Sequence, residues 1–227
     1  VALGAVRTMA HGPVEARYAV NWQHELSEPQ NAEATEATAL TLDGTWTLRR
    51  VDNLLDPRTG FVAQFQAGGG AKAALSDQNF LRLRARYQHF FPVAQRDVFS
   101  LRGELGRTLA PSRDGIPQDF LFRTGGAQSV RGYDYQSLGV KDGDAVVGGR
   151  YLAVASAEYT HWFDPKWGAA TFIDAGDAAD DRRDLDWAVG YGVGARWKSP
   201  AGPLAVDLAY GEREQQFRLH FSLAIAF

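Results

Sequence analysis

The sequence lacks several features that define common protein classes. Its 227 residues include no cysteine, which excludes a disulfide scaffold and any cysteine-based metal or redox site. Lys and Arg number 24 and Asp and Glu 27, a formal net charge of −3. This balance argues against a nucleic-acid partner, which selects for an excess of basic residues. No run of about 18 apolar residues is available for a membrane-spanning helix, and helical periodicity is absent over any useful length.

The sequence instead shows apolar and polar side chains that alternate with a period of two residues. In residues 217–227, aromatic and aliphatic side chains occupy the odd positions, and polar or small side chains occupy the even positions. Pleating sends these two sets to opposite faces of a strand. About eleven strands are expected from this pattern. They lie near residues 1–9, 14–22, 40–49, 61–65, 81–87, 98–109, 151–162, 167–175, 187–197, 204–210 and 217–227.

The alternation fits two architectures. In a soluble sandwich the apolar face points inward, whereas in a membrane barrel it meets lipid and the polar face lines the lumen. Many of these segments approach the length of about 9–11 residues that a tilted membrane-crossing strand needs. Aromatic residues such as Trp22, Trp162, Trp167 and Trp197 gather at segment ends, as interfacial girdles do. These features favour an all-β fold, a transmembrane antiparallel β-barrel, over a soluble sandwich that binds a partner.

The connections also alternate in length. Ser27–Glu36, Gly68–Gln78 and Ala110–Arg150 are long and polar, whereas Pro165–Lys166 and Ser199–Gly202 read as short turns. Long loops at one rim and short turns at the other are typical of outer-membrane barrels. Ala110–Arg150 is about forty residues long, and a loop of that length is usually functional.

Four stretches carry a family resemblance. Inside the longest loop, Phe122–Tyr133 reads FRTGGAQSVRGY and resembles the VRG(F/Y) loop of the outer-membrane assembly factor superfamily, which includes BamA, TamA and the two-partner secretion transporters. Asp52–Phe61 is similar to the family's DP-x-x-G turn. Phe172–Gly176 is similar to its F-x-D-x-G strand motif, and Phe227 to the terminal aromatic residue of its sorting signal. Two further stretches, Gly148–Tyr151 and Ser156–Thr160, resemble TamA more than BamA.

The resemblance implies a particular organisation. The family barrel has sixteen strands and follows periplasmic POTRA domains. Residues 1–227 would then be the C-terminal part of such a barrel, about eleven strands of the sixteen, with the POTRA domains absent and loop 110–150 folded into the lumen.

The resemblance also implies a function in the outer membrane of Gram-negative bacteria. Unfolded outer-membrane proteins or autotransporters would be the clients, inserted or translocated through a lateral gate between the first and last strands. Outer-membrane lipid and a periplasm-spanning TamB-like protein are the other implied partners. No cofactor, metal or covalent chemistry is implied, and the chain is not expected to be an enzyme. Two alternatives remain: a two-partner secretion transporter that exports one polypeptide, and the barrel of a patatin-like lipase fusion.

For the loop, the resemblance implies an ion-pair lock. Arg131 would contact Asp174 and also Glu158, whose strand parities allow both carboxylates to face the lumen. The other implied members are Val130, Gly132, Tyr133, Gly125 and Gly126 in the loop, and Phe172 and Gly176 in the strand motif. Gly132 would let backbone pass close to the wall, the Gly125-Gly126 pair would permit turns closed to other residues, and Tyr133 would pack against the wall.

Several residues allow a second interpretation. Asp174 and Glu158 could be a catalytic acid pair instead of partners for Arg131. Arg82, Arg84 and Arg86 form either a substrate track or a solvated luminal wall. The set Gly190, Gly192 and Gly194 allows either a close loop approach or sheet curvature. His220 reads as a luminal polar residue, since the five histidines lack metal-ligand spacing. No nucleophile elbow, phosphate loop or HExxH motif is present.

Overall fold

One antiparallel sheet contains all the long strands in the described part of the chain. The computed structural model describes residues 1–27, 35–199 and 202–223, so the terminal residue Phe227 lies outside the described part. The sheet has eleven strands in the order β1-β2-β3-β4-β5-β6-β9-β10-β11-β12-β13. Their bounds are β1 Ala2–His11, β2 Val14–Ser27, β3 Thr35–Val51, β4 Gly60–Gly70, β5 Phe80–Ala94, β6 Asp97–Leu109, β9 Tyr151–Trp162, β10 Trp167–Ala179, β11 Ala188–Ser199, β12 Gly202–Gly211 and β13 Gln216–Leu223.

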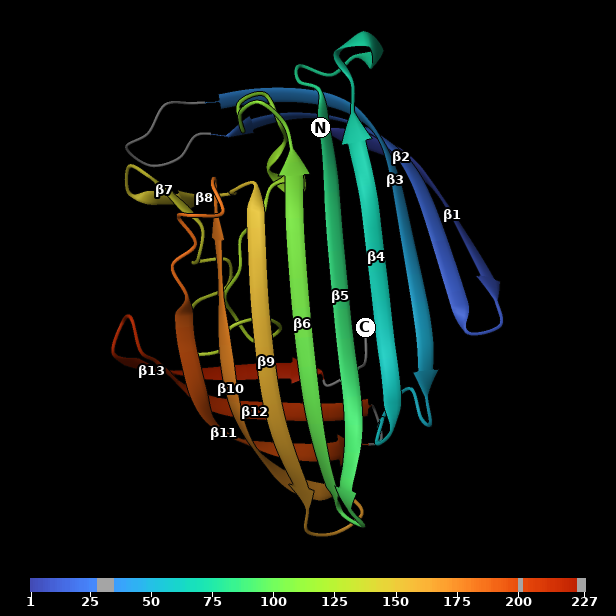
Figure 1. Cartoon of the computed structure of the whole chain (residues 1–227), viewed down its shortest axis with the longest axis vertical. Helices are drawn as coiled ribbons and strands as arrows, with labels where there is room; N and C mark the ends of the chain where they lie inside the picture. The colour runs from blue at the N-terminus through green and yellow to red at the C-terminus, as the bar shows by residue number, and fades with distance from the viewer. Residues whose placement is uncertain (28–34, 200–201, 224–227) are drawn as a thin grey trace.

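The sheet is strongly curled (Figure 1). Every strand pairs with its neighbour in sequence, except that β6 pairs with β9 and the loop between them leaves the sheet. In the described residues, β1 and β13 are the two edges and do not pair with each other. The expected all-β antiparallel architecture is confirmed.

No helix among the described residues is long and apolar enough to cross a membrane.

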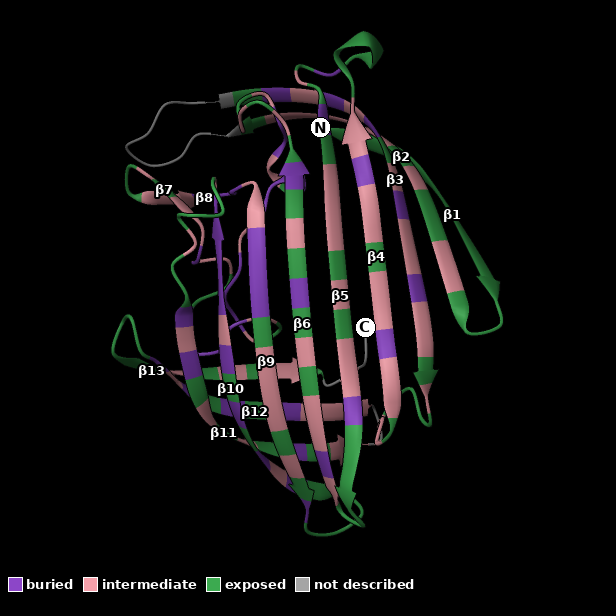
Figure 2. Cartoon of the chain, in the orientation of Figure 1, coloured by how far each residue is buried: buried purple, intermediate pink, exposed green. Residues whose placement is uncertain are grey.

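The two faces of the sheet differ in the way that the alternation predicts. On β6 the side chain of Glu104 is buried, whereas the neighbouring Leu105 is 66% exposed. On β12 Asp207 is buried between the exposed Val206 and Leu208, and Figure 2 shows this banding of buried and exposed residues along the strands. No second sheet covers the apolar face in the described part of the chain. Apolar side chains out and charged side chains in is the pattern of a membrane barrel, not of a sandwich.

Some boundaries differ from those expected. Gly68–Gly70 belongs to β4 and not to a loop, because its pairing with β5 continues as far as Gly70 opposite Phe80. Cross-strand pairing overrides the weak strand preference of glycine there. The sequence also gave no signal for the short hairpin β7 (Val140–Asp142) and β8 (Ala145–Val147), or for the 3₁₀ turns η1 (Lys72–Ala74) and η2 (Gln118–Phe120). These short elements all lie within loops.

Candidate functional site

The loop between β6 and β9, residues 110–150, packs against the inner face of the sheet through two apolar clusters. In the first, Phe122, Val130, Tyr133 and Leu138 of the loop pack with residues of β9, β10 and β11: Leu152, Val154, Ala178 and Ala188. In the second, Ile116, Phe120 and Leu121 pack with Ala39 of β3 and Phe80 of β5. The loop therefore contacts both halves of the sheet.

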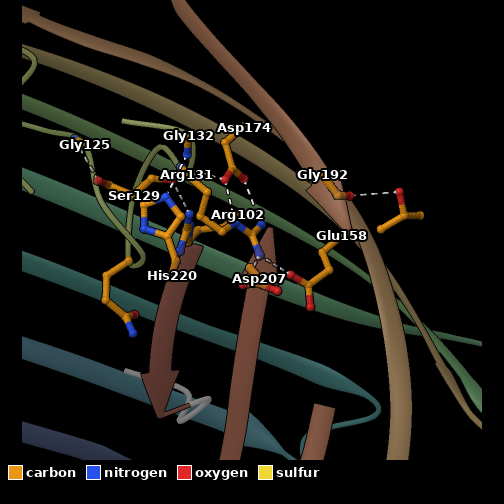
Figure 3. Close-up of polar contacts among 12 residues, drawn as sticks. Arg102, Gly125, Ser129, Arg131, Gly132, Glu158, Asp174, Gly192, Asp207 and His220 are labelled. Atoms are coloured by element: carbon orange, nitrogen blue, oxygen red, sulfur yellow. Dashed lines mark hydrogen bonds and ion pairs between the residues drawn. The ribbon is translucent and has the colours of Figure 1, made fainter. Parts of the chain in front are cut away.

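Arg131 lies against the C-terminal strands of the sheet, and Figure 3 shows its guanidinium among carboxylates from β9, β10 and β12. It pairs with Asp174 of β10 in the two-pronged geometry that Arg favours, Nε to Oδ2 at 2.7 Å and Nη2 to Oδ1 at 3.0 Å. The backbone N–H of Arg131 also donates to Asp174 Oδ2, at 3.1 Å. Its Nη1 donates to Glu158 of β9 at 2.7 Å. The two carboxylates named from the sequence are thus both bonded to Arg131.

Two further residues complete the group, and together the five form what we call the luminal ion-pair cluster: Arg131, Arg196, Glu158, Asp174 and Asp207. Asp207 of β12 accepts from Arg131 Nη1 at 3.1 Å. Arg196 of β11 bridges Asp207 and Glu158. The side chains of Arg131, Asp174 and Asp207 are 6%, 0% and 3% exposed. The cluster is therefore a desolvated network in which each buried charge has an opposite partner, the condition for tolerating buried ions.

The environment of Arg131 keeps it charged. Burial lowers the pKa of Arg131, but hydrogen bonding to Asp174 and the charges of Glu158 and Asp207 outweigh burial and raise the pKa above its ordinary value. Phe172 of β10 lies beneath the guanidinium, with its ring centroid 3.4 Å from Cζ, a cation–π contact. Asp174 thus binds Arg131, and Glu158 binds both Arg131 and Arg196, which favours the structural interpretation of the two acids over a catalytic pair.

Glycines create the space that the loop tip occupies. Gly125, Gly126 and Gly132 have φ values of 103°, 99° and 93°, which are strained for any other residue. A Cβ on Gly190 of β11 would overlap the carbonyl oxygen of Arg131. A Cβ on Gly176 would approach Val130 Cγ2 to 3.0 Å. Of the two interpretations of the β11 glycines, the close loop approach holds at Gly190.

Tyr133 anchors the end of the motif. Its side chain is fully buried, and its hydroxyl donates to the carbonyl of Val189 at 2.9 Å and accepts from the backbone N–H of Arg213 at 3.1 Å. The hydroxyl of this buried side chain therefore has a partner both as a donor and as an acceptor.

The arginines of β5 face the loop and the neighbouring wall. Arg82 lies over the ring of Phe122 at 4.5 Å, Arg84 pairs with Glu104 of β6 at 2.7 Å, and Arg86 donates to the carbonyl of Gln128 at the loop tip. Each is engaged by the barrel wall or the loop, which favours the luminal-wall interpretation over a substrate track.

The DP-x-x-G turn lies at the short-turn rim. Asp52 Oδ1 accepts from the backbone N–H groups of Arg58 and Thr59, which closes the turn. Asp56 forms an ion pair with Lys198 of β11, so the turn reaches across the lumen to the strand that carries Arg196 of the luminal ion-pair cluster.

Sequence reasoning missed Asp207, Arg196 and Arg218 and gave His220 no partner. Their parity marks them as luminal, but parity does not indicate which luminal residues the loop reaches. Figure 3 shows His220 of β13 beside Gly132. In the described residues, no group of three or more His, Asp or Glu side chains is arranged to hold a metal.

Comparison with known proteins identifies the family of the chain. Residues 6–227 match the family model of the Omp85 superfamily domain. The chain is 28% identical over 194 residues to the outer membrane protein assembly factor BamA of Nitratidesulfovibrio vulgaris, an alignment that covers 81% of this chain and 23% of the relative. The fold is similar to the crystal structure of BamA from Haemophilus ducreyi lacking POTRA domains 1–3, with a TM-score of 0.76 and 18% identity, over 97% of this chain and 53% of that one. The chain thus spans about a quarter of the length of the first protein and about half of the second. It belongs to the Omp85 superfamily and is a β-barrel protein of the bacterial outer membrane.

Proposed function

We propose that this chain is the barrel of an insertase or translocase that helps other proteins to enter the outer membrane through a lateral gate. The main support is the seated loop, since the side chain of Arg131 binds carboxylates on three strands, β9, β10 and β12. A barrel held in this way has a rigid wall next to its last strand. The relative from N. vulgaris is named as an outer membrane protein assembly factor, which is the same class of activity.

In this proposal the client pairs with the edge of β13. A strand edge presents unpaired N–H and C=O groups that template another strand, and a strand can add to it by backbone hydrogen bonds alone. The outward side chains of β13 (Phe217, Leu219, Phe221 and Leu223) are all more than half exposed, so an incoming strand would meet lipid on that face. The reaction exchanges hydrogen bonds and burial, and it needs no covalent step or cofactor. Unfolded outer-membrane proteins and autotransporters are the proposed clients, and a TamB-like protein that spans the periplasm is the proposed partner.

Photocrosslinking tests the gate. A photoreactive amino acid at Leu219, which is 57% exposed on β13, is expected to crosslink to a client during its insertion. The matched control is Leu105 on β6, which is 66% exposed to the same lipid but lies in the middle of the sheet.

Three results would contradict the proposal. One is equal crosslinking at the two positions, and another is none at either while clients insert normally. The third is crosslinking of a single exported polypeptide to the luminal loop tip at Gln128 and not to Leu219, since that pattern would indicate a two-partner secretion transporter.

A further inference from the structure

The last strand is attached to the loop by contacts separate from the luminal ion-pair cluster. The backbone N–H of Gly132 donates to His220 Nε2 at 2.9 Å, and its carbonyl accepts from Arg218 Nη1 at 3.0 Å. Arg218 also binds both carboxylate oxygens of Asp134, each at 2.9 Å. We call these four residues the strand clasp: Gly132, Asp134, Arg218 and His220. Both backbone groups of one loop residue are thus satisfied by side chains of a single strand.

The clasp depends on local geometry as much as on the two side chains. Gly132 has φ near 93°, and a Cβ there would lie 2.8 Å from the backbone nitrogen of Gly211 in β12. On the other side, a Cβ on Gly211 would overlap the carbonyl of Gly132. The two glycines therefore bring loop and sheet backbones together, so that His220 and Arg218 reach the peptide groups of the loop directly.

The clasp acts on a strand that has few other attachments. In the described residues β13 pairs only with β12. The partners of Arg131 lie on β9, β10 and β12, so the ion-pair cluster leaves β13 free to separate. Arg218 and His220 are the third and fifth residues of β13, Gln216–Leu223, while Ser222 points to the same face farther along and makes no hydrogen bond or ion pair with loop residues 110–150. Within the described residues of β13, the loop therefore binds Arg218 and His220 but not Ser222.

We propose that Arg218 and His220 are positioning residues for client insertion, because they couple the seated loop to the strand edge that accepts the client. This inference rests on the proposed insertase function. With the clasp closed, the backbone edge of β13 has a fixed place and direction. With the clasp open, β13 is held by its β12 ladder alone and samples other positions. A template that moves gives slower strand addition, since pairing must then also fix its geometry.

The test compares variants that remove the contacts with variants that keep them. His220→Leu removes the acceptor at similar volume, and His220→Gln supplies an amide oxygen in its place. Arg218→Ala removes the fork, and Arg218→Lys keeps the charge without it. Ser222→Ala is the control on the same face of the same strand.

Hydrogen–deuterium exchange of the β13 amides is measured on the protein as it is made in the cell, purified in detergent. Client crosslinking at Leu219 is measured in parallel. In the His220→Leu/Arg218→Ala double variant, β13 exchange is expected to rise about tenfold, the factor expected for losing one or two net hydrogen bonds. Client crosslinking is expected to fall several-fold. Each single variant, His220→Leu or Arg218→Ala, is expected to show part of this change. Relative to His220→Leu, His220→Gln is expected to restore most of both signals, and Ser222→Ala is expected to change neither.

The outcomes separate the clasp from the proposed function. Unchanged β13 exchange in the double variant would overturn the clasp itself. Faster exchange with normal client crosslinking would overturn the positioning role and leave the insertase function standing. Absence of client crosslinking in the unmodified protein would instead overturn the proposed function, whatever the exchange data show. Failure of His220→Gln to restore either signal would also count against the clasp, since an acceptor at that position is its central requirement.

Discussion

Replacing Arg131 with alanine is expected to unseat the loop and to reduce client insertion by at least about tenfold. The side chain makes hydrogen bonds to three carboxylates, two of which are almost fully buried. Removing one member of a buried ionic group leaves the others unpaired, at a cost of about 3–5 kcal/mol. Arg196 remains beside Glu158 and Asp207, but its hydrogen bonds do not extend to Asp174. Asp174, whose side chain is fully buried, would therefore lose its hydrogen-bonded ionic partner.

Two variants serve as controls for Arg131→Ala. Arg131→Lys keeps the charge but cannot form the two-pronged pair with Asp174, and an intermediate loss is expected. Arg123→Ala removes an arginine of the same loop whose one hydrogen bond within the described residues goes to the carbonyl of Val146, and near-normal insertion is expected. Insertion of a radiolabelled client into membranes is the measurement, at equal abundance of folded barrel. Normal insertion by Arg131→Ala would contradict a functional role for the cluster.

Replacing Gly190 with alanine is expected to displace the loop although no charge is touched. The added methyl group would occupy the position of the Arg131 carbonyl oxygen. Backbone cannot swing aside as a side-chain tip can, so the added atom forces the loop away at a cost of about 1–3 kcal/mol. Asp174 lies directly opposite Gly190 in the β10–β11 register, so the displacement pulls Arg131 away from its main partner. The expected phenotype is therefore that of a weakened Arg131→Ala variant.

Gly103→Ala is the matched control for this second prediction. Gly103 is a strand glycine on β6, and a Cβ there meets nothing within 4 Å. The same change of residue type should thus leave both barrel stability and insertion unchanged. Heat-modified migration on gels reports the stability of the barrel, and the client assay reports insertion. Equal effects of the two substitutions would show that loss of glycine, and not contact with the loop, is responsible.

The sequence predicts the strands well for a physical reason. Membrane strands separate lipid-facing from luminal side chains at every second residue, and this leaves a local signal in segments such as 204–210 and 217–227. The contacts of Arg131 with Asp174 and Glu158 could be predicted from the sequence for another reason, since all three residues lie in short motifs that resemble a known family.

The rest of the site depends on curvature, which leaves no local signal. Arg196, Asp207, Arg218 and His220 alternate with apolar residues like any luminal position. Only the curl of the sheet and the path of the loop determine that Asp207, Arg218 and His220 meet the VRGY segment and that Arg196 joins the ion-pair cluster. The glycines of β11 illustrate the same limit, because spacing alone does not tell which of them has backbone from the loop against it.

A designed disulfide between loop and wall tests the position of the loop most directly. The 227 residues hold no cysteine, so V130C and G176C would add a single pair within this chain. A Cβ at Gly176 would lie 3.0 Å from Val130 Cγ2. Changing Val130 to cysteine replaces its two methyl groups by one sulfur, which relieves this contact and leaves the two cysteines within reach of disulfide geometry. We predict that oxidation in intact cells joins V130C to G176C in most molecules, and that V130C paired with G103C on the outer face does not react. Free thiols at both positions of V130C/G176C after oxidation, in a folded barrel, would contradict the placement of the VRGY segment against β10 inside the lumen.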